Sequence, residues 1–219
     1  YQLCRMGYEV TDLETGTKLN IDNKYIMSPK DLCTIEFMDK IIDAGVKVFK
    51  IEGRARSAEY VKKTAECYRR AADAVCEGRY TPELAASLKE ELSEVFNRGF
   101  WDGYYQGARL GEWSDVYGSH ATRKKIYCGK ITNWFDRISV AEVLVESEAL
   151  RKGDDILIIG ETTGVIEQNV SEIRVDLKPT DEAGKGTLCS IHIIFPDDIR
   201  TPGGKKIRRG DKVYIWREV

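Results

Sequence analysis

The stretch "KVFKIEGRARSAEYV", residues 47–61, decides how the first half of this chain is interpreted. Its apolar residues predict a buried strand over 46–51, followed by a polar turn at Gly53 and a helix that begins at Ser57. Charged side chains surround this glycine: Lys50, Glu52, Arg54 and Arg56. Because charges cost free energy to bury, such a cluster is either a solvated rim or a functional site.

The residues before this stretch predict a second strand and a helix. "YIMSPKDLCTIEFMDKIIDAG", residues 25–45, gives a strand end, then an N-cap at Ser28, Pro29 at the first helical position and Gly45 as the stop. Strand, helix and strand joined by short links form a βαβ unit, in which the two strands pair in parallel.

Further helices and a small hairpin complete the first half. An alternating pattern over 7–23 predicts a hairpin around Thr15-Gly16. A helix is expected to end at Gly78, and Thr81 is expected to cap another. The glycine- and aromatic-rich residues 99–122 are then expected to form a connector.

The second half changes to short strands with glycine-centred turns. Six strand candidates without a helix predict a small closed β-barrel over 123–219. Within it, "LRKGDDILI" and "IRRGDKVYI" share one turn pattern of a basic pair followed by Gly-Asp. The expected fold class is therefore α/β over 1–98, a connector over 99–122, and an all-β domain over 123–219.

Composition limits the function classes. The chain has 219 residues, of which 42% are hydrophobic and 32% charged, and its net charge of −2 argues mildly against a dedicated nucleic-acid binder. It contains no apolar run of about 20 residues that could span a membrane. Six cysteines without a CxxC pair and no visible signal peptide predict a reducing cytoplasm, with the cysteines inside helices and strands buried as small hydrophobic residues.

Few residues can carry chemistry. No Ser-His-Asp, Cys-His or HExxH arrangement can be written from this sequence, which has only two histidines. The two predicted strand ends remain, because ligands bind at the carboxyl ends of parallel strands. They bring together Ser28, Lys30, Asp31, Glu52, Arg54 and Arg56. Two interpretations stay open: an anion-binding site with Glu52 held by an arginine, or a structural ion pair between Glu52 and an arginine.

The same residues carry a resemblance to a known family. "YIMSPKDLCTIEFMDKIIDAGVKVFKIEGRARSAEYV", with "AECYRRA" and "NRGFWDGYY" further on, closely resembles peptidase family U32, the collagenase-like proteins. The resemblance implies that the first half is the end of a TIM-barrel-like domain. It also implies that Cys4 is one of a four-cysteine set, and that this chain, which opens on Tyr1, is a fragment lacking an N-terminal half. One thiolate cannot hold an iron–sulfur cluster, which needs about four ligands, so no cofactor and no activity are expected from the fragment alone.

The resemblance leaves the activity divided. Some members of the family are named as peptidases that act on collagen, and others hydroxylate tRNA or ribosomal RNA with an iron–sulfur cluster. We expect the parent protein to be an RNA hydroxylase, with proteolysis or a non-catalytic binding module as alternatives. Glu52 is the candidate catalytic residue, and RNA or a peptide is the expected substrate. The open edge of the strand over 46–51 further predicts a homodimer.

Overall fold

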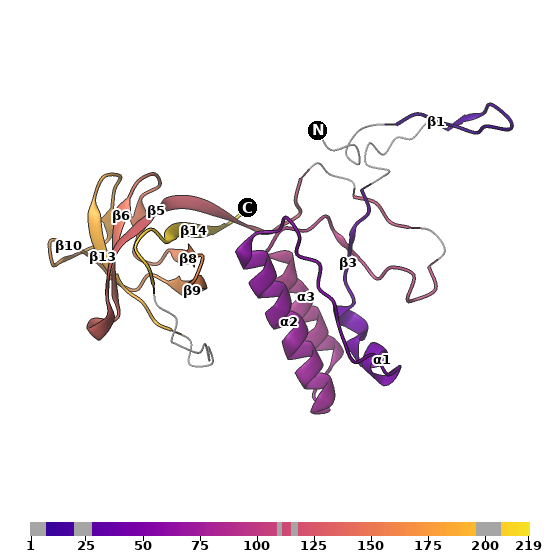
Figure 1. The fold of residues 1–219 in the computed structure, drawn as a ribbon, viewed down its shortest axis with the longest axis horizontal. Helices are drawn as coiled ribbons and strands as arrows, with labels where there is room; N and C mark the ends of the chain where they lie inside the picture. The colour runs from indigo at the N-terminus through magenta and orange to yellow at the C-terminus, as the bar shows by residue number, and fades with distance from the viewer. Residues whose placement is uncertain (1–7, 20–27, 109–110, 115–117, 196–206) are drawn as a thin grey trace. The chain divides into compact units, whose positions relative to one another are not determined.

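The structure is a computed structural model that describes residues 8–19, 28–108, 111–114, 118–195 and 207–219. It divides into two compact units, Tyr1–Thr122 and Arg123–Val219 (Figure 1). The first unit mixes helices with short strands, and the second is built on one large antiparallel sheet. Residues 99–122 count with the first unit. No helix in the described ranges is both long and apolar enough to cross a membrane.

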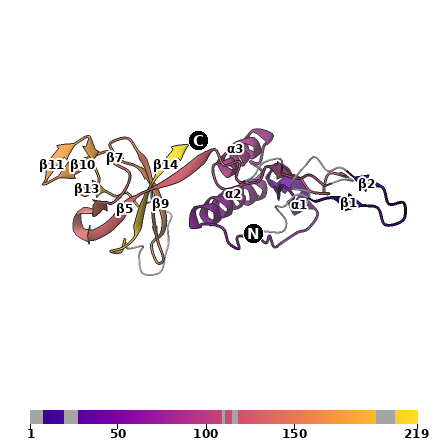
Figure 2. The same ribbon diagram turned by 90° about the horizontal axis from the view of Figure 1, so that it is seen from above.

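Two helices give the first unit its core. α2 (Ala58–Cys76) and α3 (Pro82–Ser93) lie side by side, as Figures 1 and 2 show, and pack against η2 (Ile35–Phe37) and α1 (Met38–Asp43). Their buried apolar faces meet in one cluster of Cys33, Ile35, Met38, Cys67, Ala71, Leu88 and Leu92. Helical spacing of apolar residues thus produces the core.

The expected ends of these helices are confirmed. The Thr81 hydroxyl accepts a hydrogen bond from the amide of Leu84 at 3.2 Å, which caps α3. Ser57 occupies the N-cap position of α2, although its side chain accepts no capping bond. Gly45 and Gly78 follow α1 and α2 with φ of +91° and +66°, the left-handed conformation that commonly ends a helix.

The first expected helix begins later than Ser28. Pro29 forms a bridge with Trp113, and β3 (Asp31–Leu32) pairs in parallel with β4 (Phe100–Trp101). Backbone pairing therefore holds these residues extended, and helical structure starts only at η2. The sequence pattern missed this because the pairing partners lie 69 and 84 residues away in the chain.

The expected strand over 46–51 is wrong. The segment is irregular, and its apolar side chains are exposed, with Val48 84% and Phe49 37% accessible. Within the described residues, no segment runs beside it as a pairing partner. A strand needs a neighbour to satisfy its backbone groups, so the βαβ unit is not formed here and a TIM-barrel arrangement stays a prediction.

The hairpin expected in the first half is confirmed within the described residues. β1 (Val10–Thr11) pairs antiparallel with β2 (Lys18–Leu19). The carboxylate of Asp12 accepts hydrogen bonds from the amides of Glu14 and Thr15, which shapes the turn.

The second unit contains an eight-stranded sheet in the order β11-β10-β13-β6-β5-β14-β8-β9 (Figures 1 and 2). Its strands, listed in chain order, are β5 (Arg123–Phe135), β6 (Val140–Val145), β8 (Asp155–Gly160), β9 (Gly164–Asn169), β10 (Ile173–Val175), β11 (Lys178–Thr180), β13 (Leu188–His192) and β14 (Lys212–Glu218). The six strand candidates are thus all found, one of them split into β9 and β10. A pair formed by β7 (Leu150–Arg151) and β12 (Glu182–Ala183) lies beside the sheet.

The sheet is open where a closed barrel was expected. Among the described residues its outer strands, β9 and β11, do not pair with each other. Ile166 of β9 and Ile173 of β10 nevertheless lie in the same buried cluster, so the sheet curls around one core. The large twist of neighbouring strands permits this curl without closure.

The two Gly-Asp motifs form matching turns. In the first, Asp154 accepts a hydrogen bond from the amide of Arg151 at 2.8 Å, and Gly153 has φ +90°. In the second, Asp211 accepts one from the amide of Arg208, also at 2.8 Å, and Gly210 has φ +94°. The shared sequence pattern therefore has a structural cause: the aspartate closes the turn, and the glycine supplies the left-handed residue.

Candidate functional site

A groove of about 890 Å³ opens in the first unit, lined by the segment over 46–57, by α2 and by residues near β3 and β4. We call it the arginine groove. Its charged side chains are Asp31, Lys50, Glu52, Arg54, Arg56 and Arg98, and its aromatic side chains are Phe49, Tyr60, Tyr68, Phe96 and Tyr105. Four of the six residues expected at the strand ends are thus brought to one surface, although the strand over 46–51 is not formed and the strand expected to end at residues 25–27 lies outside the described residues.

Asp31 and Arg56 form the ordered part of this groove. A carboxylate oxygen of Asp31 lies 3.2 Å from a guanidinium nitrogen of Arg56, and the other oxygen accepts a hydrogen bond from the amide of Arg98 at 3.0 Å. The Arg56 guanidinium also lies 4.2 Å from the ring centre of Phe96 and 5.2 Å from that of Tyr60. Asp31 and two rings therefore fix Arg56 in place.

Glu52 is held by its own loop. Its Oε1 accepts a hydrogen bond from the amide of Arg54 at 2.6 Å, and its carbonyl accepts one from the Tyr60 hydroxyl at 3.4 Å. In the described part of the chain it makes no ion pair with Arg54 or Arg56. Both interpretations had Glu52 paired with an arginine, and that pairing is wrong, because Arg56 pairs with Asp31 instead.

The turn that carries the arginines has one left-handed residue, and it is not the glycine. Ala55 has φ +58°, a conformation uncommon for a residue with a Cβ. Gly53 has a different role, since an added Cβ would lie 3.2 Å from a methyl group of Val61 on α2. The glycine thus lets the loop approach the helix, while Ala55 supplies the sharp turn that had been assigned to Gly53.

Two expected site residues do not line the groove, and a third lies outside the described residues. Lys30 is ion-paired with Glu112, with 2.6 Å between Nζ and Oε2. Ser28 is buried, and its hydroxyl lies 3.4 Å from a guanidinium nitrogen of Arg98. Cys4 belongs to the residues that the structure does not describe.

Arg98 and Thr64 are groove residues that the sequence reasoning missed. Arg98 stands directly before residues 99–122, which were interpreted as a connector, and it reaches the groove because β4 pairs with β3. Thr64 lies on α2, at a position that the sequence pattern predicts to be on the exposed face of the helix. One available signal was an arginine placed between Asn97 and Gly99 in a stretch rich in glycine and aromatic residues.

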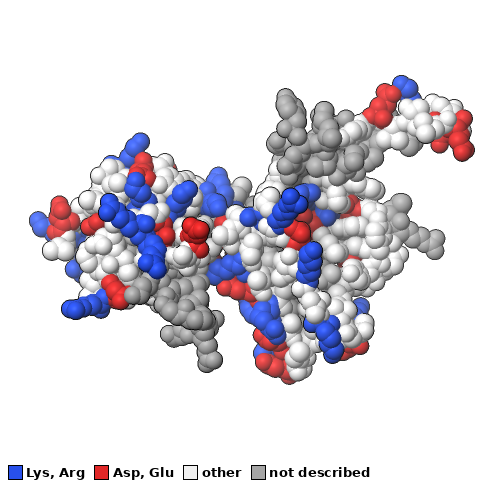
Figure 3. Space-filling model, viewed as in Figure 1, with Lys and Arg blue, Asp and Glu red and all other residues white. Residues whose placement is uncertain are grey.

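The groove has an excess of positive charge. It combines four cationic side chains with two carboxylates, and only one of these cations, Arg56, is ion-paired within the described residues. Over the face seen in Figure 3, by contrast, Lys and Arg are interspersed with Asp and Glu. The chain as a whole has a net charge of −2, so any attraction of an anion comes from the groove itself.

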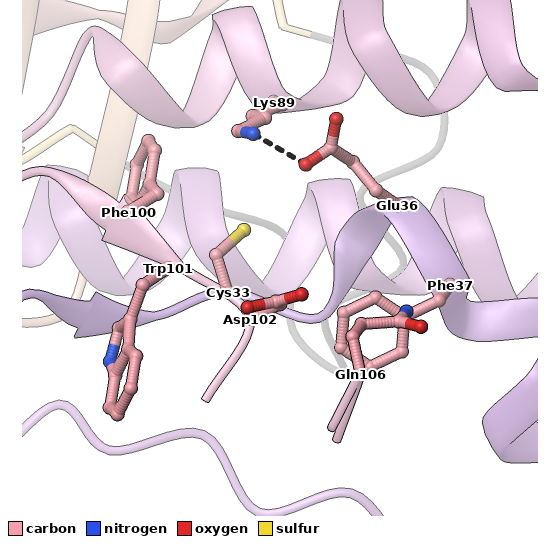
Figure 4. Close-up of a pocket in the computed structure, with 8 residues that line it drawn as sticks. All are labelled: Cys33, Glu36, Phe37, Lys89, Phe100, Trp101, Asp102 and Gln106. Carbon is pink, nitrogen blue, oxygen red and sulfur yellow. Dashed lines mark hydrogen bonds and ion pairs between the residues drawn. The ribbon is translucent and has the colours of Figure 1, made fainter. Parts of the chain in front are cut away.

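A second, smaller cavity of about 300 Å³ lies in the same unit (Figure 4). Its lining consists of Cys33, Glu36, Phe37, Lys89, Phe100, Trp101, Asp102 and Gln106. Lys89 and Glu36 form an ion pair at this cavity, as the figure shows. With one cation and two carboxylates, its lining is opposite in charge to the arginine groove.

The buried cysteines are poor nucleophiles. Burial raises the pKa of the Cys33 thiol, and it raises the pKa of Cys67 and of Cys128 to about 12 and that of Cys189 to about 11. Since the thiolate is the reactive form, these four thiols are protonated and unreactive near neutral pH. Their burial confirms the packing role expected for them, whereas Cys76, expected to be buried, is exposed.

The described residues do not fit an iron–sulfur cluster or another metal site. Throughout the described ranges, no three His, Cys, Asp or Glu side chains gather where they could hold one ion. The cluster implied by the family resemblance needs about four cysteines. The four buried cysteines are distributed over the two separate cores, which excludes them as a ligand set.

Comparison with known proteins connects this groove to a family. The model of peptidase family U32 matches residues 1–115, which include every residue of the groove. A protein named collagenase from Porphyromonas gingivalis is 53% identical over 213 residues, covering 97% of this chain and 49% of that protein. This chain therefore spans about half the length of that curated relative.

Two relatives with other names are more distant. The tRNA hydroxylation protein P1 of Bacillus subtilis is 29% identical over 164 residues, covering 73% of this chain and 38% of that protein. A 23S rRNA 5-hydroxycytidine synthase of Escherichia coli is 35% identical over 117 residues, covering 51% of this chain and 18% of that protein. The relatives thus include proteins named for proteolysis and proteins named for RNA hydroxylation.

Proposed function

Because this chain belongs to peptidase family U32, we propose that it is the RNA-binding portion of an enzyme that hydroxylates RNA. The observation that carries the proposal is the arginine groove, where unpaired cations stand among aromatic rings. Proteins recognise single-stranded RNA with this combination, since cations contact phosphates and rings stack on unpaired bases.

Different groove residues would contact the RNA backbone and the RNA base. Lys50 and Arg54 are exposed and unpaired within the described residues, so they contact phosphates and supply the salt-dependent part of the affinity. Tyr60 and Phe49 offer ring faces to a base. These contacts hold one nucleotide of a single strand in the groove.

Glu52 would read the base. One of its oxygens is occupied by the amide of Arg54, which leaves the other free to accept a hydrogen bond. A carboxylate is a suitable acceptor for the exocyclic amino group of cytosine. Glu52 therefore orients the base, while the loop that carries it stays fixed through Gly53 and Tyr60.

The cofactor is not part of this assignment. The described residues offer no cluster site, so the iron–sulfur cluster stays a prediction from the family resemblance, with Cys4 as its one ligand in this chain. No reaction step is derived through it. A missing N-terminal half and a homodimer likewise stay predictions, although the strand edge from which the homodimer was expected is not formed.

The test is complementation with the full-length protein. A strain that lacks the gene is supplied with the wild-type protein, with Glu52→Gln, or with Glu161→Gln, an exposed carboxylate in the second unit as matched control. Digested RNA is then analysed for hydroxylated nucleosides by mass spectrometry. We expect the wild type and E161Q to restore one modified nucleoside and E52Q to fail. If the content of hydroxylated nucleosides is the same in every strain, the proposal is overturned.

Proteolysis is the second candidate function, favoured by the 53% identity to a protein named collagenase. Against it, the four buried cysteines are protonated thiols near neutral pH. Incubating the full-length protein with denatured collagen separates the two: cleavage that is retained after purification to homogeneity, without any change in RNA, assigns the peptidase activity instead.

A further inference from the structure

We propose that Arg98 and Thr64 complete a phosphate-binding subsite in the arginine groove. The inference rests on the proposed function, because it names the group of the RNA that binds there. Neither residue belongs to the set that the sequence analysis identified. Both residues line the groove, and each has a hydrogen-bonding atom that no described residue uses and that is closed to solvent in this structure, so a side-chain rotation must turn it toward the ligand.

The first observation is a pair of buried polar atoms without partners. Thr64 is 7% exposed, and its hydroxyl oxygen forms no hydrogen bond with any described residue. The Nε of Arg98 is buried and also without a partner in the described ranges. Buried polar groups are nearly always hydrogen-bonded. Two unpartnered donor atoms on residues that line the same groove therefore indicate a ligand that supplies the missing acceptors.

The second observation is the charge of Arg98. Its backbone amide is bound to Asp31 at 3.0 Å, and its side chain reaches the Ser28 hydroxyl at 3.4 Å. The carboxylate of Asp31 is already paired with Arg56. Within the described residues, Arg98 therefore has no carboxylate as an ion-pair partner, although its position is fixed from two sides.

These features select the chemistry of the ligand. Every unused group can donate a hydrogen bond: the Nε–H of Arg98, the Thr64 hydroxyl and the exposed guanidinium of Arg54. A tetrahedral anion with several acceptor oxygens fits such donors, and arginine is well suited to phosphate. The ligand is therefore a phosphate group, from an RNA backbone or as a free phosphate.

The experiment measures binding to the 219-residue chain, without any activity assay. Fluorescence anisotropy gives the Kd of a labelled single-stranded oligoribonucleotide over a series of salt concentrations, and calorimetry gives the Kd of inorganic pyrophosphate. The variants are Arg98→Gln, Arg98→Lys and Thr64→Val. Arg69→Gln is the matched control, because Arg69 is an exposed arginine of α2 that is ion-paired with Asp73.

The variants should differ in two separate readouts. R98Q should weaken RNA binding about 10-fold and reduce the slope of log K against log salt by about 0.7, the value for one phosphate contact on a single strand. R98K should restore the slope but not the affinity, because it keeps the charge and lacks the Nε donor. T64V should weaken binding about threefold with an unchanged slope, and R69Q should bind as the wild type.

The outcomes separate this inference from the proposed function. RNA binding that R98Q leaves unchanged in affinity and slope overturns the subsite while RNA binding itself stands. Pyrophosphate binding that depends on Arg98, without RNA binding, keeps the subsite, assigns it to free phosphate and refutes the RNA-binding role. A chain that binds neither ligand refutes both.

Discussion

Replacing Thr64 with valine should stabilise the protein, which is unusual for a change in a buried helix position. Thr64 is 7% exposed on α2, and its hydroxyl has no hydrogen-bond partner among the described residues. Valine keeps the branched shape and the helix propensity of threonine. Because a buried unsatisfied hydroxyl costs about 1–3 kcal/mol, T64V should raise the free energy of unfolding by about 1 kcal/mol.

A threonine-to-valine substitution elsewhere in the chain should change the free energy of unfolding in the opposite direction. Thr163 is fully buried, but its hydroxyl donates a hydrogen bond to a carboxylate oxygen of Asp211 at 2.6 Å. T163V removes this donor and leaves a buried carboxylate under-satisfied, which should cost about 2 kcal/mol. The two Thr→Val variants therefore compare an unused hydroxyl with a used one at equal burial.

Urea denaturation followed by tryptophan fluorescence measures both changes. Each unit contains two tryptophans, Trp101 and Trp113 in the first and Trp134 and Trp216 in the second. The midpoint for the first unit should rise in T64V, and that for the second should fall in T163V. A T64V variant that is destabilised by about 1 kcal/mol or more would refute the reasoning, because its hydroxyl would then have a partner in the folded protein.

Four further results are expected. Glu52→Gln should change the free energy of unfolding by less than about 0.5 kcal/mol, since its side chain is exposed, and a larger loss in urea would give it a structural role. Of the cysteines in the described ranges, only exposed Cys76 should react quickly with a thiol reagent at pH 8, so that Cys76→Ser removes this fast phase. Burial raises the pKa of the Cys128 thiol to about 12. The protonated thiol therefore contributes to the free energy of unfolding below about pH 8.5, and this contribution is lost as the pH rises toward 12. An equal free energy of unfolding at pH 8 and pH 11 would contradict this. Gly160→Ala should destabilise the second unit, because the new Cβ would lie 2.0 Å from a carboxylate oxygen of Asp211 and this carboxylate would have to shift, and an unchanged melting temperature of that unit would disprove it.

The parts of the fold that depend on local sequence were predictable. Thr81 and Pro82 predict the start of α3, and glycines predict the ends of α1 and α2, because helix capping depends only on neighbouring residues. The strands of the second unit also follow from local alternation. Closure of the sheet could not be predicted, since it depends on whether β9 and β11 meet, two strands with no shared turn.

The parts that depend on distant partners were not predictable. The segment over 46–51 has strand-like residues, yet strand structure requires a neighbour that the described residues do not supply. Ser28 has the local features of an N-cap but is held extended by residues far along the chain. Arg98 lines the groove because β4 pairs with β3. The residues around Arg98 show no periodicity that indicates this pairing.

The matching Gly-Asp turns have a consequence for how the second unit arose. Arg208 stands 57 positions after Arg151, and the strands that follow the two turns, β8 and β14, pair antiparallel with Leu157 opposite Tyr214. These two residues are themselves 57 positions apart, so a local two-fold axis passes between them.

The same axis relates the neighbours of the two turns. Gly153 and Asp154 exchange backbone hydrogen bonds of 2.8 and 2.9 Å with Val170, just past β9, and Gly210 and Asp211 do the same with Ile131 on β5 at 2.8 Å each. If the unit is divided into residues 123–163 and 164–219, the turn of each half is hydrogen-bonded to a residue of the other half, as expected from a duplicated and interleaved ancestor. Neither half is complete alone, so the ancestral half-length chain would have reached this architecture only as a dimer.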